Sequence, residues 1–375
     1  SRDFSVPRLP HDYPLSRAGS AVTVECAWAA RVVIAAQWQL IWMRFRRHKL
    51  ALLSAIITII IYTVALFPEF FAPFPPNIMS SEYLYVPPQR LHLFDQQDGR
   101  LRFSPYVYGL ESYIEPEALR RVYRIDEIGL FPATVRLIGP VDKTQPMFLL
   151  GGDRLGRDVL SRLIYGTRVS MSIGLIGVVI SSFLGVLIGG LSGYLGGMFD
   201  NIIQRVIEFL RSIPTIPLWM GLAAALPMEW PPLRIYFGIT VILSLLGWTG
   251  LARIVRGRFM ALREEQFIMA AELDGASDLR IVFRYMLPAF TSHMIARTTL
   301  AIPWMILSET SLSFLGLGLR PPVVSWGVLL QDAQTVRVVS QNPWLLSPAI
   351  VVVVTVLVLN FLGDGLRDAA NPYGQ

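Results

Sequence analysis

Long runs without a charged residue constrain this chain more than any other feature of its sequence. They cover residues 50–68, 169–199, 235–252 and 338–363. An α-helix needs about 20 apolar residues to cross the hydrocarbon core of a bilayer. Only 16% of the 375 residues are charged and 53% are hydrophobic, which leaves too little polar material to cover a soluble globule of this size. The sequence therefore predicts an all-α integral membrane protein.

Two further spans are expected where the apolar pattern is interrupted. Residues 201–228 begin with polar turns at the interface and contain Pro214 and Pro217, which predict a kink. Residues 289–315 have the length of a span but include Arg297 and Glu309. Together with the four charge-free runs, these segments predict six transmembrane helices.

Basic residues beside the spans set the expected orientation. Arginines and lysines concentrate on the cytoplasmic side of membrane proteins. One basic cluster precedes the first span and consists of Arg44, Arg46, Arg47 and Lys49. A second follows the fourth span and consists of Arg253, Arg256, Arg258 and Arg263. Six spans with both termini in the cytoplasm place both clusters on the cytoplasmic side. A third group falls outside in this arrangement, after a long external loop where the charge rule is weak: Arg154, Arg157, Arg162 and Arg168.

The segments outside the core are less apolar. Residues 72–148 are rich in proline and tyrosine, and "RLHLFDQQDGRLRF" predicts a hairpin that turns near Asp98-Gly99. We expect a small extracytoplasmic insert of short strands and turns, with a disordered spacer as the alternative. The stretch before Arg44 carries Trp28, Trp38 and Trp42 but is too short to cross, which favours an interfacial helix.

Glycines recur at every fourth residue in the second span, at Gly185, Gly189, Gly193 and Gly197. Small residues at this spacing let another helix approach closely. The groove could meet a second subunit or a helix of the same bundle, and the sequence leaves both open.

The chain lacks the motifs of several catalytic classes. It has no GxxxxGK[ST], HExxH, paired-cysteine or GxSxG sequence, so it has no nucleotide-phosphate loop, no metal site and no catalytic residue of those kinds. Cys26 is a single thiol, and an isolated His293 is more often a packing residue than a ligand. Arg297 and Glu309 are candidate pathway or gate residues because intramembrane charges are costly, with extension to the interface as the alternative. They lie too far apart along one helix, about 18 Å, to pair with each other.

The segment "MAAELDGASDLRIVFRYMLP", residues 269–288, is charged although it lies between two apolar spans. Phe267, Ala270, Ala271 and Asp274 have helical spacing, and Gly275 permits a left-handed stop. Ser277 or Asp278 can cap a second short helix, and Pro288 can open the fifth span. The pattern predicts a helix, a sharp turn and a helix that project at the cytoplasmic surface and dock a partner.

At these residues the chain resembles the permease subunits of ABC importers, specifically the dipeptide/oligopeptide family. Their cytoplasmic loop carries the motif EAA, then three residues and a Gly, and after a longer gap I.LP, in which the dot is any residue. Ala270, Ala271, Gly275 and Leu287-Pro288 match this motif. Two positions differ, because Met269 replaces the usual Glu and Asp274 replaces an apolar residue before the Gly. Further matching stretches are "DRLGRDVLSRLIYGTRVS" (153–170), "ETSLSFLGLGL" (309–319), "SWGVLLQDA" (325–333) and "GDGLRDAANP" (363–372).

The resemblance implies the type I importer fold and a non-catalytic subunit of the bacterial inner membrane. The implied partners are a second permease, two ATPase subunits that hold ATP and Mg, and an extracytoplasmic binding protein; the chain itself needs no cofactor and binds no nucleic acid. It also implies an ATPase-coupling site, with the residues Phe267, Met269, Ala270, Ala271, Glu272, Asp274, Gly275 and Ala276. The expected divisions are a tail (1–48), helix 1 (49–71), the insert (72–148), a pre-core segment (149–168), a core (169–366) with the coupling loop 253–288, and a cytoplasmic C-terminus (367–375).

Three functions remain open at this stage. The leading one is half of the translocation path of an ATP-driven peptide importer, and the same architecture could import oligosaccharides or another small solute. An ion-coupled carrier is disfavoured because no inverted halves and no paired midplane acids are visible. A membrane-anchored interaction protein that acts through its insert is the third.

Overall fold

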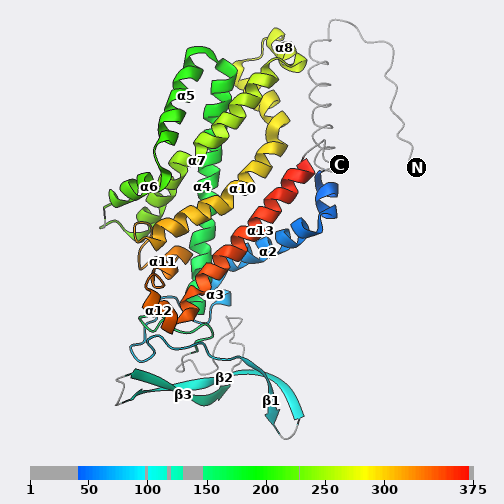
Figure 1. Ribbon diagram of the computed structural model, residues 1–375. Coiled ribbons are helices and arrows are strands. Elements are labelled where there is room, and N and C mark those ends of the chain that lie inside the picture. The colour runs from blue at the N-terminus through cyan, green and yellow to red at the C-terminus, as the bar shows by residue number, and fades with distance from the viewer. Residues whose placement is uncertain (1–40, 98–99, 116–119, 130–146, 228, 371–375) are drawn as a thin grey trace, which may run out of the picture.

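The computed structural model describes residues 41–97, 100–115, 120–129, 147–227 and 229–370. Figure 1 shows long helices that run beside one another, with a three-stranded sheet at one end and α8 at the opposite end. We call the end with the sheet the outer end and the end with α8 the inner end. The long helices are α2 (Lys49–Leu66), α4 (Val159–Leu195), α7 (Pro232–Arg263), α10 (Leu287–Phe314) and α13 (Ser347–Ala370).

Four stretches of the described chain are long and apolar enough to cross a membrane: α2, α4, α7 and residues 343–370. A fifth candidate is the pair α5 (Gly197–Ser212) and α6 (Thr215–Ala224), which is bent by 86°. The break lies at Ile213 and Pro214, so the predicted kink near these prolines is confirmed. The remaining long helix, α10, has 28 residues and contains Pro303.

Two boundaries differ from the sequence expectation. Helix α4 begins at Val159, within the expected pre-core segment, because Asp158 caps it by accepting a hydrogen bond from the backbone N–H of Ser161. The last span was expected from residue 338, but α13 begins only at Ser347. The apolar run is divided there into α12 (Val336–Gln341) and a 3-10 turn, Pro343–Leu346, because Pro343 cannot continue the preceding helix.

The insert contains an antiparallel sheet in the order β1-β2-β3, made of His92–Gln97, Arg100–Glu115 and Arg120–Gly129. Gln97 pairs with Arg100, which confirms the predicted hairpin; the turn residues Asp98 and Gly99 lie outside the described residues. Before the sheet come the short helix α3 (Pro68–Phe71) and an irregular segment. Of the tail, residues 41–47 are helical, whereas Trp28 and Trp38 lie outside the described residues.

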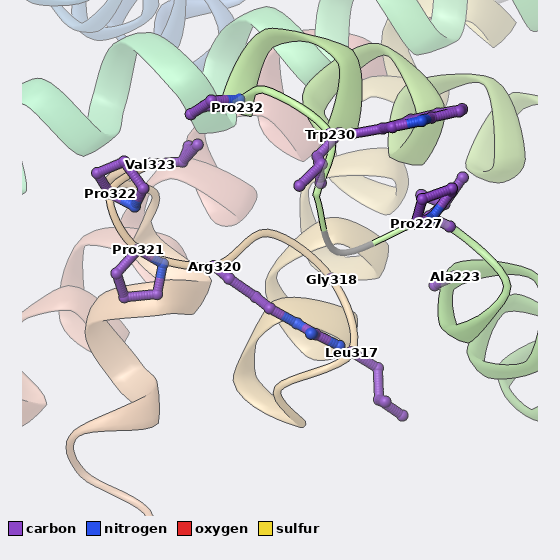
Figure 2. Close-up of a pocket in the computed structure, with 12 residues that line it drawn as sticks. Ala223, Pro227, Trp230, Pro232, Leu317, Gly318, Arg320, Pro321, Pro322 and Val323 are labelled. Carbon is purple, nitrogen blue, oxygen red and sulfur yellow. The ribbon is translucent and has the colours of Figure 1, made fainter.

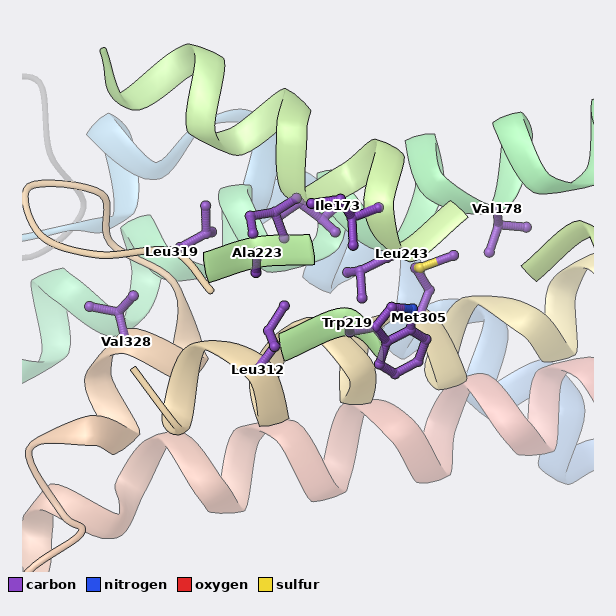
Figure 3. Packing of buried hydrophobic residues seen from close by; sticks show 11 residues of the cluster. Ile173, Val178, Trp219, Ala223, Leu243, Met305, Leu312, Leu319 and Val328 are labelled. Carbon is purple, nitrogen blue, oxygen red and sulfur yellow. The ribbon is translucent and has the colours of Figure 1, made fainter. Parts of the chain in front are cut away.

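The largest buried apolar cluster joins α4, α6, α7 and α10 with the segment that follows α10 (Figure 3). Trp219 of α6 and Met305 of α10 lie in it beside Leu243 of α7. Because lipid is as apolar as these side chains, close packing rather than the exclusion of water stabilises such contacts. The bend at Pro214 is what lets α6 return into this cluster.

The four arginines between residues 154 and 168 each have a carboxylate partner. Arg157 and Arg162 donate to Asp153, Arg154 lies 3.0 Å from Asp332, and Arg168 lies 2.7 Å from Glu69. The neighbouring carboxylates offset their positive charge. The expected topology places this basic cluster on the side where basic residues are rare, and the pairing offers a physical reason why it can lie there.

Candidate functional site

The inner end carries a compact helical hairpin between α7 and α10, which we call the α8–α9 unit. It consists of α8 (Gln266–Leu273), the turn at Gly275, α9 (Asp278–Ile281) and a π-helical turn, η2 (Val282–Met286), that runs directly into α10. Gly275 has a φ of +73°. Its N–H donates to the carbonyl of Glu272, and the N–H of Ala276 donates to that of Ala271. This is the hydrogen-bond pattern of a Schellman motif, so the predicted left-handed stop is confirmed.

One face of the unit is buried against the ends of the long helices. Ile268, Ile281 and Met286 are fully buried in a cluster with Val255 and Phe259 of α7. Ala271 belongs to this buried face and is only 6% exposed. The sequence analysis placed Ala270 and Ala271 together on the docking surface, but Ala271 packs inward because successive helix positions point about 100° apart.

The opposite face exposes large apolar side chains. Leu273 is 90% exposed, and four others are between 44% and 60% exposed: Phe267, Met269, Leu279 and Phe283. Ala270, Glu272, Asp274 and Gly275 are exposed as well, and Ala276 is half-buried. Glu272 and Asp274 add negative charge to the rim. An exposed apolar patch with a polar rim is typical of a protein–protein contact site.

Tyr194, on the last turn of α4, joins both helices of the unit. Its hydroxyl lies 3.2 Å from Oε1 of Glu272 and 3.1 Å from Oδ1 of Asp278. The guanidinium of Arg263 lies 5.9 Å from the centre of the Tyr194 ring and donates to the Tyr194 carbonyl at 3.1 Å. Of the two predicted caps of α9, Ser277 and Asp278, the residue at the N-cap is Ser277, and its side chain makes no capping hydrogen bond.

A second polar contact ties the helices together beside the unit. Arg256 of α7 binds Asp200 of α5 through two hydrogen bonds of 2.5 Å each, and Ser192 of α4 donates to the same carboxylate. Bidentate arginine–carboxylate pairs fix orientation as well as distance. The inner ends of α4, α5 and α7 are therefore held in a defined arrangement.

Three of the four regularly spaced glycines lie against α7. A Cβ added at Gly185, Gly189 or Gly193 would lie 2.9 Å or less from atoms of Leu251, Ala252 or Arg256, respectively. Gly197 does not share this face, because it begins α5 and a Cβ there would meet no atom within 4 Å. The glycine groove is thus filled by a helix of the same chain.

Arg297 and Glu309 have different surroundings on α10. Arg297 is exposed on the inner half. Glu309 is fully buried, and three hydroxyls donate to it, from Ser170 at 3.2 Å, Ser313 at 2.9 Å and Ser325 at 2.8 Å. Each hydroxyl in turn accepts a backbone N–H from the segment after α10: Leu319 to Ser313, Trp326 to Ser170 and Val328 to Ser325.

Glu309 is therefore the centre of a network that fastens residues 315–331 across α4 and α10. Both candidate pathway residues had been chosen for their charge alone. The structure brings neither near the other, and it surrounds Glu309 with protein.

A cavity of about 180 Å³ lies at the outer end between the α6–α7 connection and the segment after α10 (Figure 2). Its walls are mostly apolar and include Trp230 and four prolines, and Arg320 is the charged side chain in them. The prolines are Pro227, Pro232, Pro321 and Pro322. Nε of Arg320 donates to the carbonyl of Gly316. Such a volume holds one amino-acid side chain and is smaller than a typical ligand pocket.

Within the described part of the chain, no group of three or more histidine, cysteine, aspartate or glutamate residues could hold a metal ion. The sequence analysis missed Tyr194, Leu279 and Phe283. Leu279 and Phe283 could have been found, because each is an apolar residue in a charged, helix-forming stretch. Tyr194 could not, because it lies about 80 residues along the chain from its two partners.

Comparisons with known proteins agree over most of the chain. The family described as "Binding-protein-dependent transport system inner membrane component" matches residues 163–372, more than half of the chain. A second family, "N-terminal TM domain of oligopeptide transport permease C", matches residues 36–88.

The dipeptide transport system permease protein DppC of Bacillus subtilis is 38% identical over 223 residues, 59% of this chain and 68% of that protein. The glutathione transport system permease protein GsiD of Escherichia coli is 30% identical over 335 residues, 89% of this chain and 90% of that protein. A solved inward-facing structure of the MetNI methionine ABC transporter covers 56% of this chain and 97% of its own, with 20% identity and a TM-score of 0.39.

Proposed function

This chain belongs to the family of binding-protein-dependent transport system inner membrane components, and from that premise we propose that it forms half of the translocation path of an ATP-driven peptide importer. It is a multi-pass membrane protein of the dipeptide/oligopeptide permease type. The other half is a second, homologous permease. Two ATPase subunits bind ATP and Mg at the inner end, and a binding protein delivers the solute at the outer end.

The observation that carries this proposal is the exposed apolar face of the α8–α9 unit. Leu273 is 90% exposed at the tip of the hairpin, on the end of the molecule opposite the sheet. The sequence has no nucleotide-phosphate loop, so the energy of ATP must come from another chain. A projecting apolar surface with an acidic rim is suited to receive that chain.

The unit is built to pass on movement. Its buried face packs on α7, and η2 continues without interruption into α10. A displacement of α8 by closing ATPases is therefore expected to move the inner ends of α7 and α10. The path would then alternate between inward and outward access as two states whose balance the nucleotide shifts.

Peptides are the proposed solute class because the names of similar permeases describe dipeptide, oligopeptide or glutathione transport systems. Oligosaccharides or other small solutes are the alternative within the same architecture. We place both termini in the cytoplasm and the insert outside, in line with the basic clusters beside α2 and α7.

Reconstitution in liposomes tests the proposal. Liposomes that contain this chain, its permease partner and the ATPases should take up labelled trialanine when ATP is on the ATPase side and the binding protein is on the other. Omitting the ATPases should abolish uptake. Uptake driven by an ion gradient through this chain alone would instead identify an ion-coupled carrier, and uptake of an oligosaccharide but of no peptide would change the solute class.

A further inference from the structure

Among the described residues, the side chain of Tyr194 joins the α8–α9 unit to the inner end of α4 by hydrogen bonds. We propose that Tyr194 is a positioning residue whose hydroxyl clamps α8 and α9 to α4, so that movement of the docked unit reaches α4 as well as α7 and α10. This inference rests on the proposed coupling role of the unit. It adds a specific residue and a specific bond through which coupling passes.

The position of Tyr194 suits this role. The residue is only 7% exposed, and it lies in the cluster formed by Phe259, Ile268 and Met286. Its hydroxyl emerges from that cluster at the turn and meets Glu272 on the last turn of α8 and Asp278 on the first turn of α9. One oxygen atom therefore contacts both arms of the hairpin, on either side of Gly275.

The apolar contacts and the hydrogen bonds hold the unit in different ways. Dispersion and hydrophobic contacts are non-directional, so the packing of Ile268 and Ala271 sets the orientation of the unit less sharply than a hydrogen bond does. A hydrogen bond weakens steeply when its angle or length changes. Among the described residues, the bonds from the Tyr194 hydroxyl are the side-chain hydrogen bonds between α4 and the two helices of the hairpin.

The hydroxyl has one hydrogen and two carboxylate neighbours. Only one carboxylate accepts the hydrogen at a time, and the second would be repelled without a nearby positive charge. The guanidinium of Arg263 brings a positive charge to the Tyr194 ring and donates to the Tyr194 carbonyl. The Tyr194 hydroxyl can turn its hydrogen from Glu272 to Asp278 and back. The clamp therefore holds while α8 and α9 shift slightly.

The clamp is anchored in a rigid base. Two residues before Tyr194, Ser192 donates to Asp200, which also receives the two hydrogen bonds from Arg256. A force on the Tyr194 hydroxyl is therefore shared by α4, α5 and α7. Since Gly189 and Gly193 let α4 pack in close contact with α7, the two helices are expected to move together under this force.

Tyr194→Phe tests the clamp because it keeps the buried ring and the contact with Arg263 and removes only the hydroxyl. In the complex with permease partner and ATPases, the ATPases should still co-purify, and hydrolysis stimulated by the binding protein with trialanine should fall about three- to tenfold. Tyr62→Phe is the matched control: Tyr62 lies on α2, outside the α8–α9 unit, and its buried hydroxyl has no hydrogen-bond partner among the described residues. It should leave stimulation unchanged.

A mutant cycle separates the clamp from general damage. Glu272 and Asp278 are exposed, so the Glu272→Ala/Asp278→Ala pair should fold, and it should cause at least the loss of Tyr194→Phe because Glu272 also belongs to the acidic rim. Adding Tyr194→Phe to that pair should cause no further loss, since residues that share one interaction are not additive. Independent, additive losses, or equal behaviour of Tyr194→Phe and Tyr62→Phe, would overturn the proposal.

A second readout does not depend on transport. Spin labels at Leu195 and Leu273 report the distance between α4 and the tip of the unit in the isolated chain. The distance distribution should broaden in Tyr194→Phe and not in Tyr62→Phe; equal widths would contradict the clamp. If this result holds but wild-type chains bind no ATPase, the clamp stands and the proposed function fails.

Discussion

At the scale of single residues, Gly275 shows how local chemistry decides a functional shape. Its φ is +73°, and a Cβ there would meet no atom within 4 Å. A substitution therefore costs only backbone strain. Gly275→Val should strain the turn by about 1 to 3 kcal/mol, because a β-branched residue is disfavoured in this region. Gly275→Asn, which tolerates it, is the control. We expect Gly275→Val, and not Gly275→Asn, to lose stimulated ATP hydrolysis in the assembled complex; equal activity would show that the turn is not needed.

Asp158, the N-cap of α4, gives a second prediction at this scale. Burial raises the pKa of Asp158 to about 6, even though Ser161 donates to it. A carboxyl whose folded pKa lies above its unfolded value stabilises the fold below about pH 4, and this contribution disappears as the pH rises to about 6. The loss amounts to roughly 3 kcal/mol.

Asp158→Asn keeps a side-chain oxygen for the cap and removes the titration. The variant should therefore lack the decrease in thermal stability between pH 4 and 6, and it should exceed the wild type in stability at pH 7.5. Differential scanning fluorimetry of the detergent-solubilised protein measures both. A wild-type slope in the variant would show that Asp158 does not cause the decrease.

Single residues were predictable where the backbone alone decides, and not where a distant neighbour decides. Gly275 was identified because glycine is the residue that ends a helix in the left-handed region. Ala271 was placed on the wrong face, because nothing in the local pattern shows that α7 covers it. The partners of Glu309 come from residues as far away as Ser170, so its charge was visible in the sequence and its surroundings were not.

At the scale of elements, the packing of α4 against α7 gives the clearest prediction. A Cβ at Gly189 would lie 2.4 Å from the carbonyl oxygen of Ala252, and backbone cannot move aside as a side chain can. Gly189→Leu should therefore destabilise the helix pair by at least about 1 to 3 kcal/mol while the chain still inserts. Gly257→Leu, where a Cβ meets no atom within 4 Å, is the control. Thermal unfolding in detergent compares them; equal stability would contradict the close contact.

Helix existence was predictable at this scale, and helix limits were less so. Apolar length identified α2, α4, α7 and α13, and prolines identified the bend between α5 and α6. The beginning of α4 was missed because a capping aspartate outweighs the charged residues that follow it. The beginning of α13 was missed because Asn342-Pro343 breaks a run that hydropathy alone treats as continuous.

At the scale of the whole molecule, the arrangement across the membrane can be tested directly. The sheet and the α8–α9 unit lie at opposite ends of the helices (Figure 1). We expect the sheet outside, because a basic cluster such as the one before α2 favours the cytoplasmic side and the arginines between residues 154 and 168 are paired with carboxylates. A cysteine at Ser104, in β2, should react with an impermeant maleimide added to intact cells. The Cys26→Ser substitution in the same chain excludes labelling of the native thiol. Labelling only after lysis would show that the orientation is the opposite of the expected one.

The central claim is that the exposed face of the α8–α9 unit binds an ATPase. Leu273→Glu places a charge on a side chain that is 90% exposed, so it should not disturb the fold. Val336→Glu makes the same change at an 83% exposed position on α12, at the outer end, and serves as the control. The decisive measurement is the amount of ATPase that co-purifies with each variant from membranes. We predict a decrease of at least about tenfold for Leu273→Glu, as for a central interface residue, and none for Val336→Glu. Full recovery of the ATPase with Leu273→Glu would contradict the claim.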